Sequence, residues 1–238
     1  MLAGENDDYG SMTELYNNPA NVAGTTYGKR WRRHDWSQII EEQAADNAET
    51  QKIVMAIHGG GIEPGTSEIA LAVAGYHPAT FATPVDGYGL HDFWLFEGLL
   101  PKNNGKLHVT SIHYDDPIAI ELVQNAQRCI SLHGCTDEQA NDKIQIGGLD
   151  FELRGIVLAE LDAADIPAEI TENKDLKGEE PANIANKTKT GGGVQIELGT
   201  SYRASLFGIN KRQHRKNTTR DPFWLLAGAL RKAMSRVN

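Results

Sequence analysis

The chain has 238 residues, of which 40% are hydrophobic and 23% are charged, and its formal net charge at pH 7 is -9. This length and composition suit a soluble globular protein with a substantial core. The acidic balance argues against a general affinity for nucleic acid, and no apolar run is long enough to predict a transmembrane helix.

The N-terminal stretch MLAGENDDYG is acidic and polar. It lacks the basic and apolar regions of a secretory signal, so we expect a cytoplasmic protein, or one released by lysis if a phage encodes it. Residues 9–17 predict a short helix capped near Ser11. Residues 27–36 (YGKRWRRHDW) are basic and aromatic, which is typical either of a nucleic-acid patch or of an edge strand whose charges face water. The acidic balance of the chain favours the edge strand, and the acidic residues 36–48 predict a weak helix or a solvated loop.

The stretch 53–68 (IVMAIHGGGIEPGTSE) joins a buried strand to a helix through a glycine-rich turn. The strand is predicted over 52–57 and is followed by His58 and three glycines. The helix is predicted over 66–76, with a Thr or Ser cap at its start and Gly75 at its end. A turn of this kind usually builds a site, because glycine lets the backbone fold tightly.

Strands and helices alternate through the rest of the chain. Further strands are predicted at 93–99, 106–113, 129–132, 143–146, 168–171 and 194–198, and further helices at 118–126, 149–163 and 223–237. Residues 172–190 and the basic residues 208–221 are predicted as loops. The alternation predicts one α/β domain over 1–238, with a mixed, mainly parallel central sheet and helices on both faces. Cys129 and Cys135 flank a predicted strand that would hold them about 20 Å apart, so we expect two buried thiols.

Side chains of the metal-ligand type lie near the carboxyl ends of three predicted strands: His58, His133 and Glu197. Glu63 follows His58 across the glycine turn. A hydrolytic zinc site commonly takes two histidines and one carboxylate, and a separate carboxylate acts as general base. His58, Glu63 and His133 fit the ligand set, and Glu197 fits the base.

Two further groups of residues leave alternatives open. Glu68 is a rival carboxylate ligand, although a glutamate in the first turn of a helix is also favoured by the helix dipole. His108 and His113 lie five residues apart in one predicted strand, so they point to opposite faces. We favour His113, beside Asp115, as the histidine that contacts substrate or supports a ligand, and an ordinary loop histidine is the equal alternative.

Several motifs together resemble the phage-related poly-γ-glutamate hydrolase family, whose bacterial members are often labelled phage-related replication protein. The motifs are HGGGIEPGTSEIA (58–70), LFEGL (95–99), LHVTSIHYDDP (107–117), SLHGC (131–135), IGGLD (146–150), NIANK (183–187) and GVQIEL (193–198). The family is similar in fold to zinc carboxypeptidases. The resemblance implies one zinc ion on His58, Glu63 and His133, Glu197 as general base, and cleavage of γ-glutamyl amide bonds.

An acidic enzyme that acts on a polyanion needs a local positive patch. Arg203, close after the strand of Glu197, is our first candidate for stabilising the oxyanion and gripping substrate carboxylates. Lys187 and Lys189 are further candidates, and solvated loop charge is the equal alternative for both. Asn183, in the motif NIANK, is predicted to bind substrate together with Lys187 and His113.

Two other functions compete with this one. The first is a non-enzymatic, phage-related DNA-binding or replication accessory protein that uses the basic stretches YGKRWRRHDW and KRQHRK. The second is a zinc amidase or carboxypeptidase with another substrate. We favour a monomer that binds poly-γ-glutamate or a related peptide and interacts with neither nucleic acid nor membrane.

Overall fold

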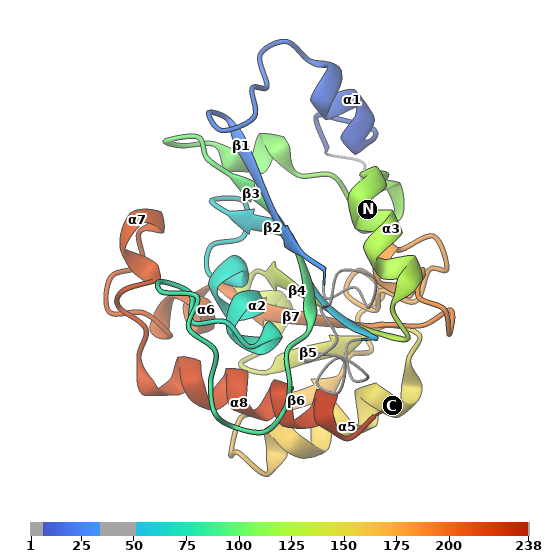
Figure 1. Ribbon diagram of the computed structural model, residues 1–238, viewed down its shortest axis with the longest axis vertical. Coiled ribbons are helices and arrows are strands. Elements are labelled where there is room, and N and C mark those ends of the chain that lie inside the picture. The colour runs from blue at the N-terminus through green and yellow to red at the C-terminus, as the bar shows by residue number, and fades with distance from the viewer. Residues whose placement is uncertain (1–6, 34–50, 238) are drawn as a thin grey trace, which may run out of the picture.

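A mixed sheet covered by helices on both faces forms the described part of the chain, residues 7–33 and 51–237 of the computed structural model (Figure 1). The seven strands run in the order β1-β3-β2-β4-β7-β5-β6. Their bounds are β1 (Tyr27–Arg32), β2 (Lys52–Gly60), β3 (Asp92–Gly98), β4 (Arg128–Cys135), β5 (Ile144–Gly147), β6 (Ala168–Ile170) and β7 (Val194–Gly199). Strands β3, β2, β4 and β7 are mutually parallel, whereas β1 and β5 pair antiparallel to this block. The predicted mixed, mainly parallel α/β fold is confirmed.

The helices divide between the two faces of the sheet. One face carries α2 (Thr66–Ala74), α5 (Phe151–Asp162) and α8 (Asp221–Ser235). The other carries α1 (Met12–Asn17), α3 (Pro117–Asn125) and the 3₁₀ turns η3 (Asn104–Leu107), η4 (Ser111–His113) and η5 (Ile184–Asn186). Three further short helices lie in the described residues: α4 (Asp137–Ala140), α6 (Thr200–Ser205) and α7 (Arg212–Arg215).

Strand β2 lies between the two cores that these layers create. Val54 and Ala56 pack in the core with α2, α5 and α8, whereas Met55 and Ile57 pack in the core with α1 and α3. Every residue of β2 is buried, and a strand covered on both faces needs a continuous apolar run of this kind.

The strand predicted over 106–113 is wrong. The segment consists instead of η3, an extended piece and η4. Its alternating pattern arises because Leu107 and Val109 are buried in the core that also contains α3, whereas Lys106 is exposed and His108 is only half-buried. Short turns can therefore imitate the period of a strand when their apolar residues happen to fall two apart.

The caps of the helices give a mixed result. Ser11 caps α1 through its side chain and Gly75 ends α2 in a left-handed conformation, both as predicted. The Thr or Ser cap predicted for α2 is wrong, because Gly65 occupies that position with φ 105°. Thr66 donates instead to the carbonyl of Glu63. Residues 208–221 are not only loop, since they contain α7.

Strand β1 is an edge strand as predicted, paired on one side with β3, although the prediction for 36–48 lies outside the described residues. Cys129 and Cys135 are free and buried, as expected. Among the residues that the structure describes, no helix is both long and apolar enough to cross a membrane.

A buried arginine ties α8 to the connection between α2 and β3. The Arg231 guanidinium donates to both Asp86 carboxylate oxygens, at 2.6 and 2.8 Å, and to the carbonyls of Val73 and Gly89. The hydrogen bond from Arg231 holds the pKa of Asp86 below its usual range. A carboxyl whose pKa is lowered by folding adds stability above its unfolded pKa of about 3.9, and this stability is lost as the pH falls through the folded pKa.

Asp86→Asn is therefore expected to lower the free energy of unfolding by about 1–3 kcal/mol at pH 7, because it leaves the buried Arg231 guanidinium without a carboxylate partner. The loss stays in this range because the Asp86 carboxylate is itself partly exposed to solvent. The loss should shrink towards zero as the pH falls below about 3.9, the unfolded pKa of aspartate. Urea unfolding at pH 7 and at a pH below about 3.9 measures this loss of stability. Asp175→Asn, at an exposed aspartate, is the matched control. An undiminished loss in acid would show that charge is not the cause.

Candidate metal and hydrolytic site

His58 lies near the carboxyl end of β2, where the strand is irregular. The register against β3 shifts between Ala56 and Gly59. Strict alternation would place the His58 side chain on the face of Ala56, but its Nε2 lies 2.8 Å from the carbonyl oxygen of Val109, in the opposite core. A local irregularity of this kind re-aims a side chain. Because the carbonyl can only accept, Nε2 donates to it, and Nδ1 faces Glu63 with its Oε1 3.0 Å away.

The glycine turn brings Glu63 back to His58. The Glu63 N–H donates to the His58 carbonyl at 2.8 Å, which closes the turn. Gly60 has φ 67°, and a Cβ there would lie 2.5 Å from the carbonyl oxygen of Gly98, so only glycine fits without rearrangement. At its other oxygen, Glu63 accepts the Gly134 N–H at 2.8 Å. Both oxygens of the carboxylate are thus held in place.

His133 on β4 and Glu197 on β7 are register partners in neighbouring parallel strands. His133 Nε2 lies 2.8 Å from the Ser131 hydroxyl, and its Nδ1 lies 3.9 Å from Glu63 Oε2. His58, His133 and Glu197 therefore lie near the carboxyl ends of three neighbouring parallel strands. Glu63 lies between the two histidines.

Burial and neighbouring charges shift the pKa values of the groups in this cluster. Burial raises the pKa of Glu197 well above the usual range, and the charge of Glu63 raises it further. Burial acts to raise the pKa of Glu63 too, but the charge and hydrogen bond of His58 hold it at about 2. Burial also lowers the pKa of His133 to about 3. Two neighbouring carboxyl groups whose pKa values are pushed apart are typical of an acid–base site.

The donor set fits a divalent metal ion. A ring nitrogen of His58 and a carboxylate oxygen of Glu63 face each other at 3.0 Å, and such a pair needs a proton or a cation between them. His133 adds an imidazole held neutral by burial, which is the protonation state that a metal requires. Two imidazoles and one carboxylate make a common ligand set of hydrolytic zinc sites.

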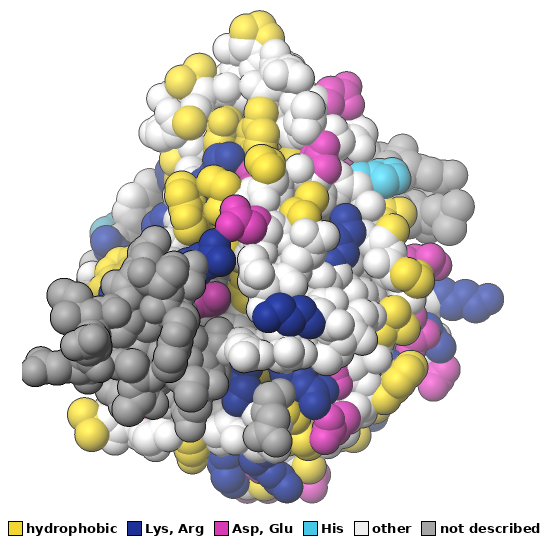
Figure 2. Space-filling view, turned by 45° about the vertical axis from the view of Figure 1, so that its right-hand side comes forward, with side chains coloured by type: hydrophobic (Ala, Val, Ile, Leu, Met, Phe, Trp, Pro, Cys, Tyr) yellow, Lys and Arg dark blue, Asp and Glu magenta, His cyan; other side chains and the backbone are white. Residues whose placement is uncertain are grey.

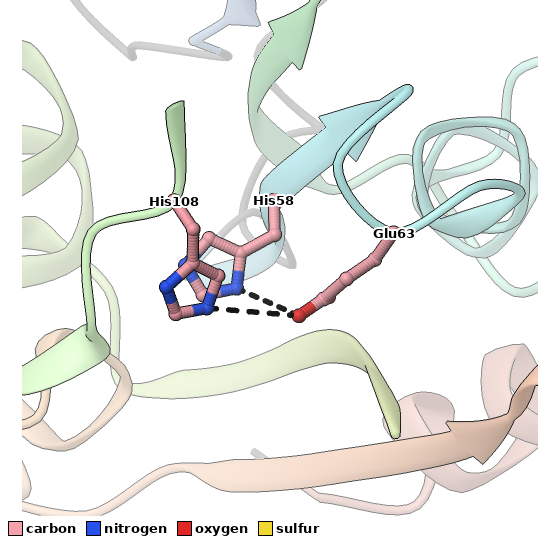
Figure 3. A group of neighbouring side chains, drawn as sticks. All are labelled: His58, Glu63 and His108. Carbon is pink, nitrogen blue, oxygen red and sulfur yellow. Dashed lines mark hydrogen bonds and ion pairs between the residues drawn. The ribbon is translucent and has the colours of Figure 1, made fainter. Parts of the chain in front are cut away.

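His108 is a third histidine at this site, and the sequence did not place it there. One ligand atom each of His58, Glu63 and His108 lie within 4.8 Å of one another (Figure 3). The His108 ring lies 3.8 Å from that of His58 between centroids, and its Nδ1 lies 2.6 Å from a carboxylate oxygen of Asp7. The prediction of a strand led us to prefer His113, which is exposed in η4. The motif LHVTSIHYDDP contains both histidines, so it could not by itself single out His108.

Arg203 is buried beside the cluster on α6. It donates to the carbonyl oxygens of Leu198, Pro64 and Cys135 and to the Thr200 hydroxyl. A guanidinium has five N–H groups, so at most one is left for a substrate. Arg203 therefore braces the backbone around the site, and its predicted contact with an oxyanion depends on that last N–H.

The predicted substrate-binding residues lie on two 3₁₀ turns that contact each other: His113 in η4, and Asn183 and Lys187 at the two ends of η5. Asn183 is only 3% exposed and uses its amide internally, which weighs against a contact with polymer. Lys187 ends η5 and is half-buried, and its predicted role stays a prediction. His113 stays a prediction as well, without the strand on which that choice depended.

Glu68 is not at the site, which leaves Glu63 as the carboxylate beside His58. The Arg215 Nε donates to Glu68 at 3.1 Å, and another nitrogen of the same guanidinium donates to the Gly60 carbonyl at 2.6 Å. The buried Arg215 side chain from the basic segment 208–221 thus packs against the glycine turn. Arg212, also in this segment, donates to the Leu99 carbonyl.

Charges on one face of the molecule are interspersed. Figure 2 shows lysines and arginines separated by acidic and apolar side chains on the visible face, without a continuous basic band. A groove that follows a nucleic-acid backbone is typically lined by continuous positive charge. This face does not have that character.

Comparisons with known proteins agree with the fold. The chain matches a family model described as poly-γ-glutamate hydrolase over residues 32–227. It is 39% identical to the UPF0714 protein YndL of Bacillus subtilis (strain 168) over 174 residues, which are 72% of this chain and 62% of YndL. It is 31% identical to the SPbeta prophage-derived UPF0714 protein YoqZ of the same strain, over 93% of this chain and 76% of YoqZ. The matched region is thus less than two thirds of YndL.

Two solved structures are similar over nearly the whole chain. A bacteriophage poly-γ-glutamate hydrolase has a TM-score of 0.79 at 28% identity and covers 97% of both chains. The zinc-free form of YndL has a TM-score of 0.77 at 32% identity and covers 95% of this chain and 96% of its own.

Proposed function

This chain belongs to the poly-γ-glutamate hydrolase family, and from that membership we propose that it is a zinc-dependent enzyme that cleaves γ-glutamyl amide bonds. One observation carries the proposal: His58, Glu63 and His133 converge beside a buried carboxyl group, Glu197, that is not needed as a ligand. The zinc-free description of the YndL structure supports the choice of metal.

We assign His58, Glu63 and His133 as the metal ligands. His58 and His133 both face the carboxylate through Nδ1, because their Nε2 atoms have partners in Val109 and Ser131. Such partners on the far side of a ligand imidazole fix its orientation. When bound, zinc would supply a Lewis acid for the scissile carbonyl and would lower the pKa of a water molecule.

In its ionised form, Glu197 takes the proton of the attacking water and returns it to the leaving amine. It lies across from His133 in the register and is buried, so the proton stays within the site during turnover. Its hydrogen bond from Gln195 occupies one oxygen and leaves the other for the water. Arg203, packed against Gly134, adds a fixed positive charge behind the same carboxyl groups.

The substrate follows from the family and from the need for local positive charge. The chain is acidic as a whole, so a polyanion must be held by particular cations. Lys187 is our candidate for the glutamyl carboxylates, since it is half-buried at the end of η5.

The purified protein is expected to shorten poly-γ-glutamate and to leave poly-α-glutamate and peptidoglycan fragments intact. An enzyme that binds the transition state of one amide geometry does not serve another equally well. Gel filtration of the polymer and amine release measure the reaction. A faster release from peptidoglycan fragments would assign the same metal site to a cell-wall amidase instead.

The rival DNA-binding function loses part of its support. Arg215, in the basic stretch KRQHRK, is only 2% exposed and bonds Glu68 and Gly60, so it is not available to a phosphate. We therefore keep the hydrolase as the single proposed function.

A further inference from the structure

We propose that Gln195, held in one orientation by Asn183, positions the Glu197 carboxylate for proton transfer. The inference rests on the proposed role of Glu197 as general base and adds two positioning residues to it. Gln195 and Glu197 lie two apart on β7 and so point to the same face of the sheet.

The three side chains form a hydrogen-bonded chain of fixed direction. The Ala185 backbone N–H donates to Asn183 Oδ1 at 3.0 Å. Asn183 Nδ2 donates to Gln195 Oε1 at 2.8 Å, and Gln195 Nε2 donates to Glu197 Oε1 at 2.9 Å. A backbone N–H can only donate, so the Asn183 oxygen must face Ala185 and its NH₂ must face Gln195.

That anchor decides which end of the Gln195 amide reaches the carboxylate. If the amide were turned over, its NH₂ would face the NH₂ of Asn183, and its oxygen would face a Glu197 oxygen. The first contact would be repulsive, and the second would be repulsive whenever Glu197 is ionised, as it must be to act as the base. The Ala185 N–H therefore sets the orientation of Asn183, and Asn183 sets that of Gln195. As a result, Gln195 presents an N–H donor to Glu197 Oε1.

The chain is also closed off from water. Asn183 and Gln195 are 3% and 6% exposed. Residues 176–178 lie directly over Gln195, since its Nε2 also lies 3.4 Å from the Leu176 carbonyl and a Cβ on Gly178 would lie 2.7 Å from its Oε1. A buried amide with satisfied partners has little freedom to turn.

The two oxygens of the Glu197 carboxylate therefore differ in their hydrogen bonding. Oε1 is fixed by Gln195, whereas Oε2 has no hydrogen-bond partner among the described side chains and backbone groups. Holding a catalytic group in its productive geometry lowers the barrier without any new contact to substrate. Asn183 and Gln195 thus act on the reaction through Glu197 alone.

The sharpest test changes one atom type. Asn183→Asp keeps an acceptor for Ala185 but presents an oxygen to Gln195, so the Gln195 amide must turn and offer its own oxygen to Glu197. Gln195→Leu removes the donor outright. Both variants are expected to lower kcat on poly-γ-glutamate about 10–100-fold, with KM and zinc content unchanged, as is usual for partners that orient a functional group.

Gln145→Leu is the matched control. Gln145 is a buried glutamine on the neighbouring strand β5 and the register partner of Glu197, but its amide donates to Ala140 and Glu169. It should lose stability in urea and keep kcat. An equal fall of kcat in this variant would mean that any damage to the sheet slows the enzyme, and the proposal would be overturned.

A second background separates this inference from the proposed function. In Glu197→Gln protein, Asn183→Asp should cause no further loss of the residual rate, since there is no carboxylate left to orient. An undiminished further loss would refute the positioning role. Wild-type kcat in both Asn183→Asp and Gln195→Leu, with activity lost in Glu197→Gln, would refute it too and leave the base role standing. Full activity in Glu197→Gln would overturn the base role itself.

Discussion

Glu197→Gln is expected to lower kcat on poly-γ-glutamate by roughly 10²–10⁴-fold, the usual contribution of a general base, while zinc stays bound. Glutamine keeps the size of the side chain and still accepts the hydrogen bond from Gln195 through its oxygen. It cannot take a proton from water. Because the three proposed ligands are other residues, metal content should not fall.

The measurement is a pair of quantities on one preparation: the rate of polymer cleavage and the zinc content by elemental analysis. Glu138→Gln, at an exposed glutamate of α4, is the matched control and should change neither. Retained cleavage by Glu197→Gln would exclude Glu197 as the base. Loss of zinc together with activity would make Glu197 a ligand and would require another base.

The order of strands and helices could be predicted well because it depends on local patterns. The β2 run IVMAI, the caps of α1 and α2 at Ser11 and Gly75, and the Asp-Pro start of α3 each read directly from a few neighbouring residues. The class of the sheet, mixed and mainly parallel, followed from the alternation of strands with helices. Burial on both faces then explains why β2 carries no polar face.

The errors come from contacts between distant parts of the chain. His108 reaches the site because a turn replaces the predicted strand and because Asp7, about a hundred residues earlier, holds its ring. Asn183 looked like a loop residue free to bind substrate, but its amide is used by Ala185 and Gln195. No local pattern reports which partner a side chain will find.

The position of His58 shows the same limit on a smaller scale. The sequence indicates that it follows a strand, and simple alternation puts it on the face of Ala56. The irregular register between Ala56 and Gly59 moves it to the other face. The glycines in this turn thus have two effects: they permit the return to Glu63, and they allow the strand to depart from its period.

His133→Ala is expected to weaken zinc binding more than about 100-fold. His108→Ala should weaken it at most about 100-fold, the upper end of the usual cost of losing a residue that supports a ligand without binding the metal. Both histidines place a nitrogen 3.9 Å from Glu63. His133 is buried on a central strand, and ligands on strands are held more precisely than those on turns. The His108 side chain is 33% exposed and lies between two 3₁₀ turns.

Competition with a chromophoric chelator measures the affinity directly and does not depend on activity. His214→Ala, at an exposed histidine of α7, is the matched control and should bind zinc like the wild type. The reverse order, with His108→Ala the weaker binder, would make His58, Glu63 and His108 the ligand set. His133 would then stand beside Glu197 as a positioning group. The comparison therefore decides which of two histidines completes the site, because geometry alone places both within reach of Glu63.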